Sequence, residues 1–166
     1  MEILWAGWRS AYMQSVTDAS TPKTDDCLFC ELPGSGPDDE TLIVERGEHV
    51  FSVMNLYPYT TGHLMVTPYR HVGVPGEANA DEQAEMWTML DRAQRGLQAA
   101  LGPDAFNIGA NIGRDAGAGV LGHLHLHVVP RWRGDANFMT TSANARILPE
   151  SIQETRIRLL EAIAGI

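Results

Sequence analysis

The feature that most constrains the fold is the segment GHLHLHVVP at residues 122–130, in which histidine alternates with aliphatic residues. Successive side chains of a β-strand point to opposite faces. The segment therefore predicts a strand with His123, His125 and His127 on one face and aliphatic residues sealing a core on the other. At about 3.3 Å per residue, neighbouring imidazoles on that face lie roughly 7 Å apart. Pro130 lacks an amide donor and is expected to end the strand or to lie at a sheet edge.

Three imidazoles on one face leave three interpretations open. They are a structural accident, a catalytic metal cluster, or a phosphoryl-type catalytic site, because histidine can act as nucleophile, acid, base or ligand. In the third case a neutral imidazole attacks phosphorus and forms a phosphoramidate, which divides one difficult step into two. Donors on either side then stabilise the charge on the phosphoryl oxygens. The middle residue, His125, is best placed to attack.

The rest of the chain predicts short strands and two helices. Strands are expected at 42–45 and 49–54, joined as a hairpin, and at 63–67 and 105–112. A closing helix is expected at 150–164. The main helix begins near Asn79 or Asp81, both suitable caps, and ends at Gly102. Its apolar face has spacings of four, three, four and four and consists of Met86, Leu90, Ala93, Leu97 and Leu101. The pattern is that of an α+β fold, an antiparallel sheet of about five strands with one main and one C-terminal helix.

Length and charge limit the possible classes of protein. The 166 residues fit one domain, with an N-terminal arm (1–26), a core (27–149) and a C-terminal helix (150–166). A net charge of −9 argues against broad binding of nucleic acid, although a local pocket can still hold a phosphate. Neither a membrane span nor a signal peptide is recognisable, so a cytoplasmic protein is expected. The aromatic arm is expected to dock on this subunit or on a partner, which favours a homodimer or larger homo-oligomer.

The motif His-φ-His-φ-His-φ-φ at 123–129, with φ apolar, is identified as that of the histidine triad (HIT) nucleotide-binding proteins. Residues 4–9, 55–63 and 130–138 resemble the branch that contains bacterial diadenosine tetraphosphate phosphorylases. The resemblance implies a HIT-like fold, in which two subunits commonly join their sheets. It also implies cleavage of a dinucleoside polyphosphate at the α-phosphorus through a nucleotidyl-His125 intermediate, with phosphate or water as second acceptor. The alternatives are a purine nucleoside phosphoramidase and a zinc-stabilised nucleotide-binding protein with little turnover.

The same resemblance implies roles for individual residues. His127 donates to the α-phosphate or the leaving group, and His63 matches a family histidine beside the triad. The second ring nitrogen of His125 should donate to a backbone carbonyl, that of Gly122 or a neighbour. The residues implied to bind the nucleotide or its phosphates are Asn55, Asn111, Gly117, Ala118, Gly119, Arg131 and Trp132.

Several of these assignments have alternatives. Asn55 matches a residue that binds the ribose hydroxyls, but an asparagine there can also cap a turn. At Ala118 and Gly119 many relatives carry Gln, Gly or Ser, so this chain lacks side-chain donors for the second acceptor. Arg131 or the nearby Arg133 could neutralise distal phosphates. Trp132 is expected near the polyphosphate, with packing at an interface as the alternative.

Two cysteines three residues apart cannot staple a secreted scaffold, and a metal or redox role is favoured. Cys27 and Cys30 need two further ligands, and His49, His71 and His123 are the candidates. In metal-containing relatives the ligands match Cys27, Cys30, His71 and His123. A closed Cys₂His₂ site of this kind would hold structural zinc and would remove His123 from the chemistry. The alternative is two buried thiols without a metal.

Overall fold

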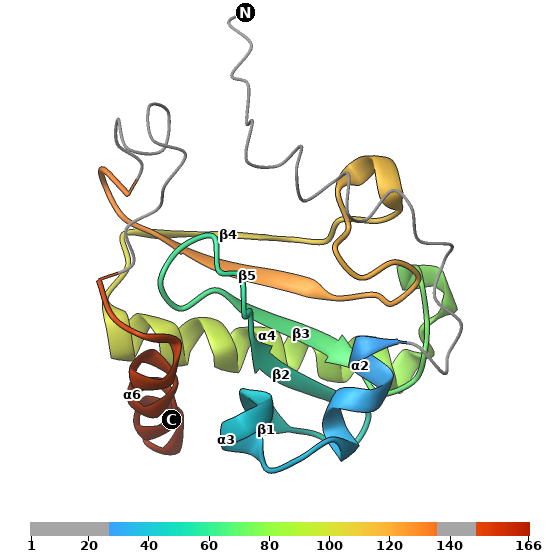
Figure 1. Ribbon diagram of the computed structural model, residues 1–166, viewed down its shortest axis with the longest axis horizontal. Coiled ribbons are helices and arrows are strands. Elements are labelled where there is room, and N and C mark those ends of the chain that lie inside the picture. The colour runs from blue at the N-terminus through green and yellow to red at the C-terminus, as the bar shows by residue number, and fades with distance from the viewer. Residues whose placement is uncertain (1–26, 136–148) are drawn as a thin grey trace, which may run out of the picture.

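The computed structural model describes residues 27–135 and 149–166 (Figure 1). The predicted N-terminal arm (1–26) and most of the segment expected to be irregular after the triad lie outside the described residues. One antiparallel sheet of five strands, in the order β1-β2-β3-β5-β4, organises the described part. The strands are β1 (Ile43–Arg46), β2 (Val50–Met54), β3 (Leu64–Pro68), β4 (Ala105–Gly109) and β5 (Leu126–Arg131). The α+β fold expected from the sequence is confirmed.

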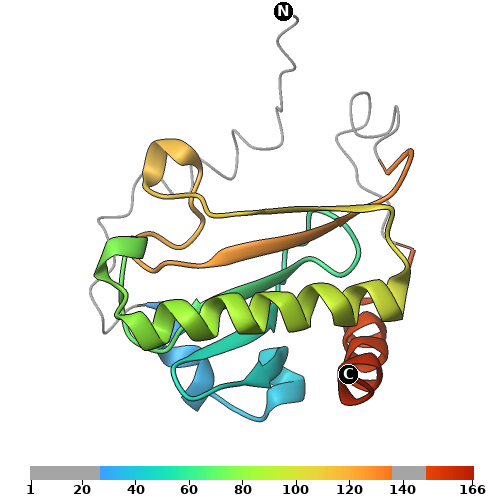
Figure 2. The ribbon, with the colours of Figure 1, turned by 180° about the vertical axis from the view of Figure 1, so that it is seen from behind.

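Helices lie on one face of the sheet and around its ends (Figures 1 and 2). The longest, α4 (Ala80–Leu101), runs along the sheet, and α6 (Ile152–Ala164) packs against α4. Short helices, which the sequence did not predict, lie in the segments between these elements and before β1. They are α2 (Leu28–Glu31), η2 (Leu32–Gly34), α3 (Asp38–Thr41), η3 (Pro75–Glu77) and η4 (Arg114–Ala116). Among the described residues, no helix is both long and apolar enough to cross a membrane.

The limits of α4 follow from local chemistry. The Asn79 side chain accepts a hydrogen bond from the amide of Glu82 at 2.9 Å, and the Glu82 carboxylate accepts from the amide of Asn79 at 2.7 Å. This capping box satisfies two amides that the first turn cannot pair. Gly102 ends the helix with a φ of 58°, a left-handed conformation that glycine adopts without strain. Asn79, one of the two predicted caps, is therefore the start of the helix.

The triad segment differs in two ways from the expected strand. β5 begins only at Leu126, because the β3 ladder ends there and Leu124 is held instead by single bonds to Val72 and Thr67. Pro130 does not end the strand or lie at an edge, but sits inside β5, between β3 and β4. The N and C=O of one residue point to the same side of a strand. Thr60 Oγ1 donates to the carbonyl of Pro130 at 2.7 Å, so this carbonyl faces the β3 side of β5, beyond the residues of β3 that pair with β5. The position of the missing amide faces the same side, where the β3–β5 ladder has already ended and needs no donor from Pro130.

Burial differs sharply across the sheet. Every residue of β2 and β3 is buried, whereas β4, the edge strand beside β5, is exposed over most of its length. β4 is also shorter than predicted and ends at Gly109, before the chain enters the glycine-rich segment that leads to the triad. The triad therefore lies between a buried half and an open half of the sheet.

Candidate functional site

The three triad histidines are buried on the sheet, with 2%, 3% and 9% of His123, His125 and His127 exposed. Their rings are not evenly spaced in the way that an ideal strand predicts. The centroids of His125 and His127 are 5.0 Å apart and the rings meet edge to face at 79°. The expected spacing of roughly 7 Å is wrong for this pair because the rings turn toward each other.

The orientation of His125 is set by a backbone carbonyl. Its Nδ1 lies 2.8 Å from the carbonyl oxygen of His123, which can only accept, so Nδ1 carries the proton and Nε2 the lone pair. The acceptor is thus the neighbour of Gly122, one of the carbonyls that the sequence suggested. Burial lowers the pKa of His125, so its ring is neutral at pH 7. A neutral imidazole with a fixed lone pair is suited to nucleophilic attack.

A chain of hydrogen bonds sets the tautomer of His127. The amide of Tyr59 donates to His63 Nδ1 at 3.1 Å, so the proton of His63 is on Nε2. That atom lies 2.9 Å from His127 Nδ1 and donates to it, which leaves the proton of His127 on Nε2. The pKa of His127 falls to about 4, first because the ring is buried and second because His125 is close. His127 is therefore a neutral donor at pH 7.

Asn111 lies beside this donor. Its Nδ2 is 3.4 Å from His127 Nε2, and both atoms are donors under the tautomer just described. Two donors cannot satisfy each other, so both remain available to an acceptor placed between them, and a phosphoryl oxygen is such an acceptor.

Asn55 makes contacts typical of a turn. Its Oδ1 accepts from the amide of Tyr57 at 2.9 Å, and its Nδ2 lies 3.3 Å from His63 Nδ1. The turn-capping interaction considered for this residue is thus present. The same contacts place the side chain directly against His63.

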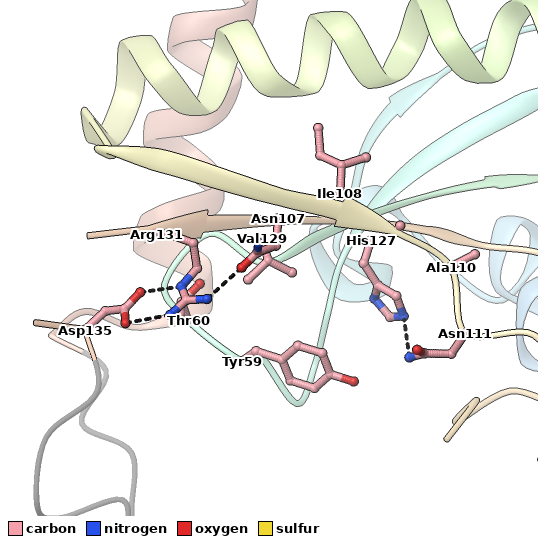
Figure 3. Close-up of a pocket in the computed structure, with 11 residues that line it drawn as sticks. Tyr59, Thr60, Asn107, Ile108, Ala110, Asn111, His127, Val129, Arg131 and Asp135 are labelled. Atoms are coloured by element: carbon pink, nitrogen blue, oxygen red, sulfur yellow. Dashed lines mark hydrogen bonds and ion pairs between the residues drawn. The ribbon is translucent and has the colours of Figure 1, made fainter. Parts of the chain in front are cut away.

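A pocket of about 370 Å³ opens next to His127 (Figure 3). Of the predicted site residues, it brings together His127, Asn111 and Arg131. The sequence missed the rest of its lining, although Val129 follows from the alternation of β5. The other lining residues are Tyr59, Thr60, Asn107, Ile108, Gly109, Ala110, Val129 and Asp135.

Other predicted contacts lie outside this pocket. In the glycine-rich segment Gly117 and Ala118 are buried and Gly119 is exposed, and Gly117 takes a φ of 84°, which favours glycine. The amide of Trp132 donates to Asp135, and the amide of Arg133 donates to Asp104. These backbone contacts shape the turn that follows β5.

Four predicted metal ligands meet on the other side of the triad. The candidate ligand atoms of Cys27, Cys30, His71 and His123 all lie within 4.8 Å of one another. His123 Nδ1 is 3.2 Å from Cys27 Sγ and 3.5 Å from Cys30 Sγ, and His71 Nδ1 is 3.4 Å from Cys30 Sγ. Zinc bonds of standard length at tetrahedral angles give S···N separations of roughly 3.5 Å. The remaining histidine candidate, His49, is not part of this cluster.

The protonation of this cluster also suits a metal. His123 Nε2 lies 2.9 Å from the carbonyl of Pro68 and donates to it, so the lone pair of Nδ1 points at the thiols. Burial, together with Cys27, raises the pKa of the Cys30 thiol to about 11. A thiolate at this position therefore needs a cation to compensate it, and a divalent metal does so.

The cluster is connected to His125 in two ways. The carbonyl that orients His125 belongs to His123, a member of the cluster. Phe29, between the two cysteines, packs against both imidazoles, with centroid distances of 5.4 Å to His123 and 5.1 Å to His125. Helix α2 thus carries an aromatic wall for the central ring as well as a cysteine of the cluster.

Comparisons with known proteins agree with this geometry. The family model described as HIT domain matches residues 37–134. A Mycobacterium tuberculosis protein named AP-4-A phosphorylase is 39% identical over 163 residues, which span 96% of this chain and 83% of that protein.

Solved structures agree as well. A Zn-bound histidine triad family protein from Mycobacterium smegmatis superposes with a TM-score of 0.68 and 28% identity, covering 86% of this chain and 96% of the other. A histidine triad nucleotide-binding protein from Sulfolobus tokodaii gives the same TM-score and 29% identity, covering 84% and 93%.

Proposed function

The chain belongs to the HIT family, and from that premise we propose that it is a nucleotidyl transferase or hydrolase that cleaves dinucleoside polyphosphates, such as diadenosine tetraphosphate, at the α-phosphorus. The observation that carries the proposal is the hydrogen bond from His125 Nδ1 to the His123 carbonyl, which leaves a neutral Nε2 lone pair beside the donors of His127 and Asn111. The name of the Mycobacterium tuberculosis relative supports the choice of substrate.

In the first step Nε2 of His125 attacks the α-phosphorus in line with the bridging oxygen. A nitrogen–phosphorus bond forms, and the phosphorus–oxygen bond to the rest of the polyphosphate breaks. The electron pair leaves with that oxygen, on a group that is already anionic. His125 keeps its Nδ1 proton on the His123 carbonyl. His127 and Asn111 stabilise the phosphoryl and leaving oxygens by donating hydrogen bonds.

In the second step an oxygen of phosphate or water attacks the same phosphorus, and His125 leaves with its lone pair restored. The proton of the acceptor passes to solvent. Phosphate as acceptor converts diadenosine tetraphosphate into ADP and ATP, whereas water gives AMP and ATP. We propose phosphate, because the relative with the greatest coverage described above is named a phosphorylase. Ala118 and Gly119 offer only backbone amides to either acceptor.

We propose that Cys27, Cys30, His71 and His123 hold zinc, as in a structural Cys₂His₂ site. When bound, the metal would crosslink the segment at α2 to the segment that precedes β5. No ligand position would remain open for substrate, so the chemistry is left to His125 and His127. The Zn-bound relative from Mycobacterium smegmatis supports this assignment.

We further propose a homodimer in which the sheets join at their edges. The edge strand β4 is exposed, and Ile108 and Ile112 present 41% and 45% of their surface. An exposed edge with apolar side chains is a template for pairing with another strand. Light scattering of the full chain tests the assembly: a monomer at micromolar concentration would contradict it.

The nucleophile is tested with His125→Ala, and His49→Ala, which changes a histidine outside both clusters, is the matched control. Turnover of diadenosine tetraphosphate should fall by roughly 10⁴-fold or more in the first variant and stay unchanged in the control. Mass spectrometry of quenched reactions should show a nucleotidyl adduct on wild type and control but not on His125→Ala, which should still bind AMP. If the wild type gives neither turnover nor adduct with any polyphosphate, the chain is a nucleotide-binding protein instead.

A further inference from the structure

The pocket beside His127 continues the catalytic face of the sheet away from the triad. His127, Val129 and Arg131 alternate along β5 and therefore lie on one face, which spans about 13 Å at 3.3 Å per residue. The β4 register places Gly109 opposite His127 and Asn107 opposite Val129. Figure 3 shows the side chains of His127, Val129 and Arg131 on the same side of the strands, with Ile108 on the opposite side.

The two walls of this groove leave room for a chain-like ligand. One wall is the Tyr59–Thr60 segment, where the ring of Tyr59 lies over His63 at 4.5 Å and over His127 at 5.8 Å between centroids. The other wall is β4, which has no side chain opposite His127 because Gly109 stands there. A Cβ at Gly109 would meet nothing within 4 Å, so the space is open at the end where the leaving group emerges.

The far end holds a charge-compensated cluster. Arg131 donates from Nε to Asp135 Oδ2 at 2.5 Å and from Nη2 to Oδ1 at 2.9 Å. Its Nη1 donates to Asn107 Oδ1 at 2.6 Å. The side chain of Asp135 is only 12% exposed and that of Arg131 is 42% exposed. The pair thus holds the guanidinium charge against a carboxylate, and Arg131, Asp135 and Asn107 all line the groove.

This arrangement favours a neutral partner over an anion. A phosphate chain gains most from uncompensated cations, and here Asp135 already takes the bidentate position that a phosphate would occupy on Arg131. Amide, carboxylate and guanidinium groups together match hydroxyls and the polar edge of a base, which both donate and accept.

We propose that this groove is the leaving-group subsite, and that Arg131, Asp135 and Asn107 bind the second nucleoside of the substrate while the polyphosphate bridges the distance from His127. The inference rests on the proposed function for the position of the cleaved bond. It replaces the expectation that Arg131 neutralises distal phosphates, and it makes the cluster the part of the site that distinguishes a dinucleoside from a mononucleoside polyphosphate.

The test compares diadenosine tetraphosphate with adenosine tetraphosphate, which has the same four phosphates but lacks the second nucleoside. Asn107→Ala and Asp135→Asn should each raise KM for the dinucleotide about tenfold. Each removes a proposed hydrogen bond to the second nucleoside from a cluster that contains charged groups. They should leave KM for adenosine tetraphosphate unchanged or lower, because Asp135→Asn frees the charge of Arg131. Asp104→Asn, outside the groove, is the control.

Binding measured on the inactive His125→Ala chain separates this inference from the proposed function, because it needs no turnover. A tenfold loss of affinity confined to the dinucleotide supports the subsite even if the wild type proves inactive. Equal losses of affinity for both ligands would show that the cluster binds the phosphates. No loss for either ligand would show that the cluster binds neither part of the substrate. Both results overturn the proposal. Asn107→Ala removes a side chain and keeps the β4 backbone that the proposed dimer would pair, so it keeps the test valid if Asp135→Asn disturbs the turn after β5.

Discussion

The two regions that flank the triad are built in opposite ways. On one side, Cys27, Cys30, His71 and His123 turn their ligand atoms toward one another inside the protein. On the other, the groove along β4 and β5 is open, and its polar groups are arranged around an empty span between His127 and the Arg131–Asp135 pair. The first region is suited to a small cation, whereas the second is suited to a large ligand.

The comparison shows how one catalytic ring can be both rigid and selective. His125 takes its orientation from the closed side, through the carbonyl of His123 and the ring of Phe29. In the proposed reaction it meets its substrate on the open side. Changes to the closed side should therefore reduce stability and rate together, whereas changes to the groove should alter affinity and leave stability unchanged.

The largest effect is expected from Cys27→Ser. The variant loses one of the proposed zinc ligands at a fully buried position, so unfolding should cost about 4 kcal/mol less, which lowers Tm by roughly 10 °C in a chain of this size. Phe29 and His123, which hold the ring of His125, would then no longer be fixed by the proposed metal site, so kcat should fall as well. Metal analysis, thermal unfolding and kcat on the same preparation check this expectation. Glu31→Ala, an exposed change on the same helix, is the control. A variant with the wild-type Tm and kcat would contradict the coupling.

The closed side could be predicted from the sequence because its signals are local or carried by motifs. Two cysteines one helical turn apart and the alternating histidines each specify their surroundings within a few residues. The carbonyl partner of His125 was predicted to within one residue for the same reason: an extended chain allows few acceptors near Nδ1.

The residues that line the groove on the open side could not be predicted in this way. Asn107 reaches Arg131 only through the β4–β5 register, which no local pattern specifies. Tyr59 lies against His63 and His127 because the loop before β3 folds back over β5, fixed by the bond from Thr60 to Pro130. The same bond explains why a proline that local rules place at an edge is tolerated inside the sheet.

A smaller effect is expected from His63, which sets the tautomer of His127 beside the groove. In His63→Leu the amide of Tyr59 and Nδ1 of His127 both lose their partner, so His127 no longer has a fixed tautomer. We expect kcat to fall about 10- to 100-fold, as for other residues that orient a catalytic histidine, with little change in the Kd for AMP. His63→Gln keeps polar atoms at this buried position and should restore part of the rate. If the leucine variant keeps the wild-type kcat, the hydrogen bonds from Tyr59 through His63 to His127 do not contribute to catalysis.

The smallest effect is expected from pH, and its sign follows from burial. Burial, and then the neighbouring His125, lower the pKa of His127 from 6.5 in the unfolded chain to about 4 in the folded one, and burial lowers that of His125. The ring of His127 therefore stays neutral as pH falls through 6.5, and the lowered pKa of His125 moves its protonation below pH 6.5, so the acid limb of kcat/KM should lie below pH 6.5. The free energy of unfolding should fall over the same acid range, because the unfolded chain binds protons below pH 6.5 that the folded chain does not bind until about pH 4. Rate profiles and denaturant midpoints across this range check both expectations. As a control, Asp135→Asn in the groove should leave the shape of both pH profiles, that of kcat/KM and that of the free energy of unfolding, unchanged. An acid limb of kcat/KM near pH 6.5 would show that the triad is open to water rather than held by the closed side.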